Sequence, residues 1–282
     1  MSAEAARKYA YFPGCTLATT AVEYDASGRA VARALGLELS ELEEWNCCGA
    51  TFPLSTENVM DMIGPARSLI AAEARQEDLV TLCAVCFNVL RRTDRFLKTH
   101  PVETERLNLF LEAGHFAGSG RVRHLLEILR DDLGWEAIAA RVTRPLTGWR
   151  LAAYYGCMLL RPSAEMQLDN AEAPTILGDL IRALGAESVP ISHATECCGS
   201  YLLVSQPAVT DRLSQDILRS ARRAGAQVVL TACPLCRHNL DQTQRGLPAA
   251  ERLPILYFTQ VLAAAFGLAE HAPAALSPEA VA

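Results

Sequence analysis

The chain has 282 residues, of which 50% are hydrophobic and 21% charged, and its formal net charge is −6. This composition suits a soluble globular protein of one large or two smaller domains, and its negative charge offers no general attraction to nucleic acid or anionic lipid. No uncharged apolar run approaches the roughly 20 residues of a membrane span, and the polar start Met1–Lys8 is unlike a signal peptide, so we expect a cytoplasmic protein with reduced thiols.

The first half of the chain alternates strand-like and helical segments. Tyr9–Phe12 predicts a short buried strand, and Cys15 follows it closely. The compact apolar run Leu79–Leu82 predicts another strand, which Cys83 and Cys86 follow at once. Because open α/β sheets bind ligands beyond the carboxyl ends of their strands, these cysteines stand where such a fold places its site. Helical periodicity is predicted over residues 24–37, 58–78 (interrupted at Gly64-Pro65), 87–100, 105–115 and 124–139.

The second half repeats this arrangement. Pro145 and Gly148 mark the boundary, so we predict one domain over residues 1–145 and a second over 146–270. The segment Leu151–Tyr155 is the counterpart of the first strand and leads into Gly156-Cys157. The Ala/Pro-rich end, 271–282, is predicted to be disordered. Further predicted segments are a helix near 175–184, an extended run at 188–191, a helix over 208–224, a strand over 228–231 and a strand-to-helix finish over 253–268.

All ten cysteines fall in one pattern that occurs twice: a single cysteine, then Cys-Cys-Gly, then Cys-x2-Cys. In the first copy 31 residues separate the single cysteine from the pair, and in the second copy 39. Beyond the pair, both copies have the same spacing, so duplication of one α/β unit is the simplest explanation. The first set is Cys15, Cys47, Cys48, Cys83 and Cys86, and the second set is Cys157, Cys197, Cys198, Cys233 and Cys236.

Ten cysteines in a reducing compartment favour metal or redox chemistry over structural disulfides. Neighbouring side chains such as Cys47 and Cys48 point to opposite faces of an extended backbone, so one tetrahedral ion is difficult for both to bind, whereas a multi-iron cluster accepts divergent thiolates. Four alternatives stay open: a disulfide framework, structural zinc with a cysteine left over, a cubane cluster with a spare cysteine, and an iron–sulfur centre that uses all five. We favour the last.

The doubled pattern resembles the CCG-domain family and, within it, the B-type subunit of heterodisulfide reductase. The similarity extends over roughly residues 9 to 268. It implies that each five-cysteine set holds a noncubane [4Fe-4S] cluster and that a disulfide is cleaved in a cavity between two similar α/β domains. No ligand position is missing, and zinc in one site is a minor alternative. Further matches are Tyr11-Phe12-Pro13-Gly14-Cys15, His124-Leu125-Leu126-Glu127, Arg144-Pro145-Leu146-Thr147-Gly148, Tyr154-Tyr155-Gly156-Cys157 and Phe258-Thr259-Gln260.

The resemblance also implies partners. The chain lacks the cubane signature Cys-x2-Cys-x2-Cys-x3-Cys, so we predict that it receives electrons from an iron–sulfur C-type subunit, with a flavin-bearing A-type subunit further back. The leading function is two-electron reduction of a small disulfide, or the reverse oxidation, including sulfur-oxidising systems of the same type. The alternative is a CCG electron-transfer subunit that anchors a succinate or fumarate:quinone reductase. Its amphipathic segments 122–139 and 255–268 would then lie on a membrane; under the leading function, membrane contact is peripheral and made through partners.

Three polar residues near the cysteines are further candidates. His193 precedes Cys197 by four residues and could bond a cluster sulfur or protonate a product thiolate. Arg161 closely follows Cys157 and could contact an anionic substrate. His238, two residues after Cys236, has Asn88 as its first-copy counterpart, so any role it has is not shared. For each of the three, a purely structural or solvated side chain is the competing interpretation.

Overall fold

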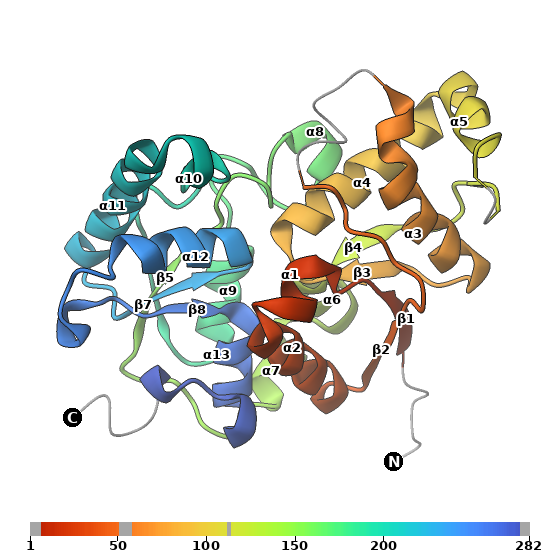
Figure 1. Cartoon of the computed structure of the whole chain (residues 1–282). Coiled ribbons are helices and arrows are strands. Elements are labelled where there is room, and N and C mark those ends of the chain that lie inside the picture. The colour runs from red at the N-terminus through yellow and green to blue at the C-terminus, as the bar shows by residue number, and fades with distance from the viewer. Residues whose placement is uncertain (1–6, 51–57, 112–113, 277–282) are drawn as a thin grey trace, which may run out of the picture.

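The computed structural model describes residues 7–50, 58–111 and 114–276. The chain forms two α/β units side by side (Figure 1). Each has a four-stranded, all-parallel sheet, with strand order β2-β1-β3-β4 in the first and β6-β5-β7-β8 in the second. The predicted class, two similar α/β domains, is confirmed. The strands are β1 (Arg7–Tyr11), β2 (Leu37–Glu41), β3 (Leu79–Thr81), β4 (Val122–His124), β5 (Arg150–Ala153), β6 (Glu187–Val189), β7 (Val228–Thr231) and β8 (Ile255–Tyr257).

Helices cover both faces of each sheet, so the central strands β3 and β7 are completely buried, as is usual for parallel sheets. The helices of the first unit are α1 (Gly14–Thr19), α2 (Val22–Ala34), α3 (Ile63–Ala74), α4 (Ala84–Thr99), α5 (Pro101–Asn108), α6 (Leu125–Ile128) and α7 (Trp135–Ala140). Those of the second are α8 (Ser163–Met166), α9 (Ile176–Ala183), α10 (Leu202–Ser205), α11 (Pro207–Arg223), α12 (Pro234–Thr243) and α13 (Phe258–Ala265). Short 3₁₀ turns are Val59–Met62, Ala249–Glu251, Ala269–His271 and Ala274–Leu276.

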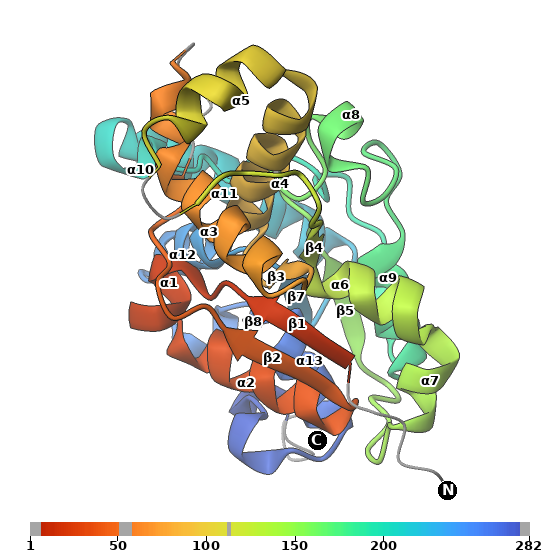
Figure 2. The ribbon, with the colours of Figure 1, turned by 90° about the vertical axis from the view of Figure 1, so that its right-hand side faces the viewer.

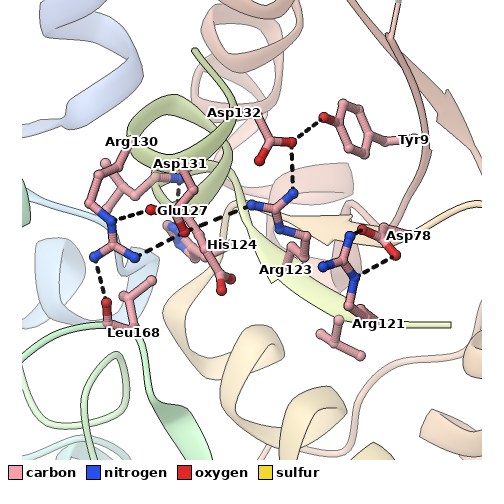
Figure 3. Close-up of polar contacts among 12 residues, drawn as sticks. Tyr9, Asp78, Arg121, Arg123, His124, Glu127, Arg130, Asp131, Asp132 and Leu168 are labelled. Carbon is pink, nitrogen blue, oxygen red and sulfur yellow. Dashed lines mark hydrogen bonds and ion pairs between the residues drawn. The ribbon is translucent and has the colours of Figure 1, made fainter. Parts of the chain in front are cut away.

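The helix predicted over residues 124–139 is largely confirmed, but it is divided: α6, a π-helical turn (Leu129–Leu133) and α7 follow the edge strand β4 (Val122–His124). Gly134, at φ +82°, separates the π turn from α7. Polar contacts fix this irregular segment to its surroundings (Figure 3): Asp132 accepts from Tyr9 and Arg123, and Arg130 donates to the carbonyl of Leu168 in the second unit. Helical periodicity is present in the sequence, but pairing with β3 determines how the segment begins.

Two smaller predictions also need correction. The interruption expected at Gly64-Pro65 is absent, because Pro65 lies in the first turn of α3, where no intrahelical N–H bond is lost. The disorder predicted from residue 271 is wrong for residues 271–276, where Leu276 is buried in a 3₁₀ turn. Residues 277–282 lie outside the described part, as do 112 and 113 within the predicted helix 105–115, of which α5 and the residues up to 111 are described.

The two units meet along an interface built from the elements that follow their strands. Helix α13 of the second unit packs on α2 of the first (Figure 2), and Ser27 and Thr259 share a hydrogen bond of 2.6 Å there. The backbone N–H of Ala84 donates to the carbonyl of Ala232 across the interface (3.0 Å). The hydroxyl of Tyr24 donates to the Leu82 carbonyl (2.6 Å) and approaches that of Ala232 (3.3 Å). These contacts join the residues that immediately precede or follow Cys83 and Cys233.

Of the two segments that the alternative function would place on a membrane, residues 255–266 and 122–129 are buried, whereas residues 130–137 are exposed or half-buried. Most side chains of α6 and of the first turns of α13, among them Leu125 and Phe258, are fully buried. Within the described residues, no helix combines the length and the apolar character needed to cross a membrane.

Candidate metal centres

Each set of cysteines gathers at the carboxyl ends of two adjacent strands. In both sheets the chain reverses its direction of winding between the first and third strands, which is where doubly wound folds bind ligands. Cys15 follows β1, and Cys83 and Cys86 follow β3 as the N-cap and third residue of α4. Cys233 and Cys236 occupy the same places on α12. The positive end of each helix dipole therefore faces two sulfurs, which favours their thiolate form.

The sulfurs in each set contact one another in the same order. In the first set, Cys15 and Cys47 lie 3.6 Å apart and Cys48 and Cys86 lie 3.5 Å apart, measured between Sγ atoms. Hydrogen bonds between Cys47 and Cys48, and between Cys86 and Cys83, complete a chain of five sulfurs. The second set repeats this order through Cys157, Cys197, Cys198, Cys236 and Cys233. Two segments that differ in most residues have therefore retained one arrangement of thiols.

The backbone after each Cys-Cys pair is shaped to donate hydrogen bonds to sulfur. Gly49 and Ala50 have φ of 77° and 56°, and Gly199 and Ser200 have 97° and 50°. Two successive left-handed residues turn their N–H groups toward one side and form a concave donor site of the kind found around iron–sulfur centres. The Gly199 N–H lies 3.3 Å from the Cys197 sulfur, and Gly49 N–H bonds Cys47 in the same way.

The thiols share protons unequally along each chain of sulfurs. The hydrogen bond with Cys86 lowers the pKa of Cys48 to about 7, and its partner's pKa is raised. In the second set the hydrogen bond with Cys157 lowers the pKa of Cys197 to about 3, and the contact with Cys236 lowers that of Cys233. In each set the contacts between sulfurs therefore favour the thiolate form of some cysteines over that of their partners. Thiolate is the form that binds metal.

The donor set fits an iron–sulfur cluster. Five soft sulfur ligands per set, N–H···S bonds and a largely buried position are the features that such centres use. The Asn239 side-chain amide adds another donor, 3.4 Å from the Cys198 sulfur. Within the described residues, no three His, Cys, Asp or Glu side chains are grouped as ligands of one metal ion; the sulfurs form an extended row instead. Cys15 and Cys47 would be the outer ligands of the first set, since both are exposed, whereas Cys157 and Cys197 are partly covered.

Arg161 and His193 lie near the second set but have different surroundings. The Arg161 guanidinium donates to the carbonyls of Thr195 and Ala171 (both 3.0 Å) and pairs with Glu172 (3.0 Å), so it braces the loop that leads to Cys197. His193 bonds Ser192 (2.9 Å) and lines a polar surface cavity beside α11, which no cysteine lines among the described residues. Their proposed roles toward substrate stay predictions.

The side chain of Asn88 closes one side of the interface between the two units. Its amide donates to the carbonyls of Met158 and Arg161 (both 2.7 Å) and contacts the Met166 sulfur (3.3 Å). These partners belong to the segment around α8, which Figure 1 shows against α4. We call this region, Asn88 with Met158–Met166, the closed seam.

The related region on the other side of the interface is a cavity of about 380 Å³. Residues Thr16–Glu23 of the first unit and Pro234–Asp241 of the second, including His238, line it, together with Tyr201 and Tyr257. We call it the open seam. The difference follows from chain length: the second copy has eight more residues between its first cysteine and its pair, and this insertion forms the segment that packs on α4. The first copy has no such insertion to cover α12.

Two tyrosines at the centre were not visible in the sequence pattern. Tyr24 stacks on Tyr257 (ring centroids 3.9 Å apart) and holds the carbonyl that precedes Cys83. The side chain of Tyr201 is 44% exposed; its partial burial raises the pKa of the phenol, and the charges of Cys83, Cys48 and, more weakly, Cys233 add to this. Tyr201 stands three residues after Cys198, and this closeness in sequence was the one available signal.

The chain is similar to several known proteins over most of its length. The family model for the CCG cysteine-rich domain matches residues 9–91 and 151–241. The 8-methylmenaquinol:fumarate reductase membrane anchor subunit of Wolinella succinogenes is 31% identical, over 93% of both chains. A protein of Archaeoglobus profundus, named as similar to the B-type subunit of heterodisulfide reductase, is 29% identical, over 92% of this chain and 91% of that one. The B-type subunit of the ferredoxin:CoB-CoM heterodisulfide reductase of Methanosarcina mazei is 26% identical, over 92% and 89%.

Among solved structures, a hypothetical protein from Helicobacter pylori has the same fold, with a TM-score of 0.71 and 13% sequence identity. The match covers 93% of this chain and 49% of that one, so this chain spans about half of its length.

Proposed function

The chain belongs to the CCG cysteine-rich domain family, and from this premise we propose that it is the catalytic subunit of a heterodisulfide reductase-type complex. Its reaction is the reduction of a disulfide by two electrons and two protons to two thiols, or the reverse. The observation that carries the proposal is the presence of two complete five-sulfur sets, in one contact order, joined through Ala84 and Ala232. Two one-electron centres that face one site could each deliver one of the two electrons.

Each five-cysteine set would hold one [4Fe-4S] cluster, noncubane by family resemblance, and each cluster would supply one electron when bound. The protein's own residues hold the sulfurs in order, donate N–H bonds to them and keep the inner ligands dry: Cys48, Cys83, Cys86, Cys198, Cys233 and Cys236 are buried. Tyr201 lines the open seam, and its hydroxyl is proposed to donate to a product thiolate. Arg161 and His193 are proposed to act through the loop before Cys197, and zinc in one site is the minor alternative.

The proposed partners are an iron–sulfur C-type subunit, which passes electrons to this chain, and a flavin-bearing A-type subunit, which passes electrons to the C-type subunit. The complex is proposed to lie in the cytoplasm, or at the inner membrane through those partners. Relatives named as the B-type subunit of ferredoxin-dependent heterodisulfide reductases support a multisubunit assembly. The substrate is a small thiol or disulfide, and the chemistry serves either a reductive or a sulfur-oxidising system.

A second candidate is an electron-transfer subunit of a fumarate or succinate:quinone reductase. Its support is the 31% identity to a protein named as the membrane anchor of a menaquinol:fumarate reductase. Since residues 122–129 and 255–266 are buried, a membrane contact would use the exposed part of the first segment, residues 130–137, or other surfaces such as α5 with exposed Val102 and the following Phe110.

The test is anaerobic purification followed by assay of iron, sulfide and zinc per chain. About eight irons and eight sulfides, the content of two [4Fe-4S] centres, together with viologen-driven reduction of a disulfide, are expected. Four irons with one zinc would rule out two-cluster cleavage. Eight irons with electron transfer to a quinone analogue but to no disulfide, and recovery in the membrane fraction, would establish the second candidate instead.

A further inference from the structure

We propose that the open seam is a binding site that selects uncharged or positively charged sulfur compounds over polyanionic ones. The inference rests on the proposed function, because it concerns the substrate that the two sulfur sets would act upon. Nothing in the family match assigns the charge of this chain's substrate.

The cavity adjoins the exposed end of the first sulfur set. Thr16, which lines it, has its Oγ1 atom 3.8 Å from the sulfur of Cys15. On the opposite wall, Pro234 directly follows Cys233. Tyr201, three residues after Cys198, also lines the cavity. No cysteine is among the described residues that line the cavity, so a small molecule in the open seam lies next to the first sulfur set at Thr16, the neighbour of Cys15, whereas the space that Cys157, Cys198, Cys233 and Cys236 line is only about 10 Å³.

The described lining of the cavity contains two carboxylates and a single arginine, and the arginine is paired with both carboxylates. Arg237 donates to Glu23 across the interface (Nη1–Oε1 2.7 Å) and faces Asp241 (Nε–Oδ2 3.5 Å). Its guanidinium also stacks on the ring of Tyr257, 4.5 Å from the centroid. The Arg237 guanidinium is thus shared by two carboxylates, and the ring of Tyr257 covers one of its faces. Glu23 and Asp241 keep 43% and 49% of their side-chain surface exposed, so both carboxylates can meet a ligand.

A ligand in this cavity finds donors suited to neutral groups. Thr16, Thr20 and Tyr201 offer hydroxyls, and Ala21 and Leu235 offer apolar contact. With His238 neutral, the described lining as a whole carries one net negative charge. A compound with several carboxylates, phosphates or sulfonates would therefore meet like charge, because Arg237, already paired, is the single arginine or lysine among the described residues of the lining. An amine would instead lie near Asp241 or Glu23.

The experiment compares three small disulfides on the iron-loaded protein: cystamine with two positive charges, 2-hydroxyethyl disulfide with none, and dithiodiglycolate with two negative charges. Two reduced viologen radicals and two protons convert each disulfide into two thiols. We expect kcat/KM for cystamine and 2-hydroxyethyl disulfide to exceed that for dithiodiglycolate by at least tenfold. The Asp241→Asn variant should reduce the cystamine to dithiodiglycolate ratio by about fivefold, as expected for one partly exposed carboxylate.

The matched control is Asp211→Asn, an exposed aspartate on α11 outside the cavity, which should leave the ratio unchanged. Binding of the same compounds is measured separately by calorimetry on the iron-loaded protein. A preference for dithiodiglycolate, or a ratio that Asp241→Asn does not move in either assay, overturns the inference. Charge-selective binding without turnover of any disulfide would instead reject the proposed function while the selectivity of the cavity stands.

Discussion

The two copies of the cysteine unit share their sulfur order but differ in how they are covered. In the first copy Cys15 and Cys47 are exposed beside the open seam, and in the second Cys157 and Cys197 are partly covered beside the closed seam. The eight additional residues of the second copy account for the difference. Ligand geometry and access are therefore set by separate parts of the chain, so access can change in one copy while the ligands stay the same.

The largest expected effect comes from removing a buried ligand in either copy. Cys48→Ala and Cys198→Ala should each lose one cluster, about four irons per chain, and reduce disulfide turnover by more than 100-fold, because the reaction needs both one-electron centres. Iron analysis and the viologen assay measure this. Appreciable turnover in either variant would mean that the copies are not used together.

The next test concerns two glycines that bring backbone close to sulfur. A Cβ on Gly14 would lie 2.8 Å from the Cys86 sulfur, and one on Gly156 would lie 3.1 Å from that of Cys236. Both residues have positive φ, which by itself costs about 1–2 kcal/mol in a non-glycine residue. We expect Gly14→Ala to reduce the free energy of unfolding by about 3 kcal/mol and to lower the iron content of the first set, with a smaller effect for Gly156→Ala.

Gly36 supplies the control for backbone strain alone, since it has φ of +72° and nothing within 4 Å of a Cβ. Gly36→Ala should cost about 1 kcal/mol and leave iron unchanged. Equal losses in Gly14→Ala and Gly36→Ala would show that crowding at the sulfur is unimportant.

Asn88 on α4 and His238 on α12 occupy matching positions in the two copies but have different surroundings. Asn88→Ala leaves the carbonyls of Met158 and Arg161 without their amide donor, and we expect a loss of about 2 kcal/mol in stability. His238 is exposed at the open seam, so His238→Ala should change stability by less than about 0.5 kcal/mol. Chemical unfolding of both variants measures the contrast, and similar losses would contradict the closed and open assignment.

The smallest effect is a pH dependence that only the first copy has. His124 accepts from the Leu126 N–H at Nδ1 (3.2 Å) and bonds the Leu82 carbonyl through Nε2 (2.7 Å), so only the neutral ring satisfies both contacts. Burial lowers its pKa to about 4. The two hydrogen bonds of the neutral His124 ring therefore contribute fully to stability above the unfolded pKa of about 6.5. Their contribution is lost as the pH falls toward 4.

Between pH 7.5 and 5.5 the loss should be about 1 kcal/mol. Unfolding of the iron-loaded protein at these two pH values measures it, and His124→Asn should remove the difference. The second copy has Tyr257 at the matching strand end, which does not titrate in this range. A pH dependence that persists in the variant would assign it to other groups.

The sequence was sufficient for the grouping of the cysteines and for the fold class because both follow from local patterns. Ten cysteines in one repeated spacing identify the sets, and strands such as Leu79–Thr81 are short apolar runs whose ends are visible in the chain. Edge strand β4 was not visible, because its three residues become a strand only through pairing with β3. Tyr201 and Asn88 act through contacts with residues far away in the chain, which spacing cannot reveal. The eight-residue difference was visible, but only the packing of α8 on α4 shows what it does.

The bond from Ala84 N–H to the Ala232 carbonyl has no mirror image, because the residue that matches Ala84 is Pro234, which lacks an N–H. In an assembly of two identical chains every substitution appears twice, so both halves of a two-fold contact must stay compatible with it. Once the two units share one chain, a change can be made on one side only. Loss of a donor at Pro234, and growth of a covering segment in one copy, are changes of this kind. Because the two repeats share one chain, they need not be identical, and the open seam can coexist with the closed seam.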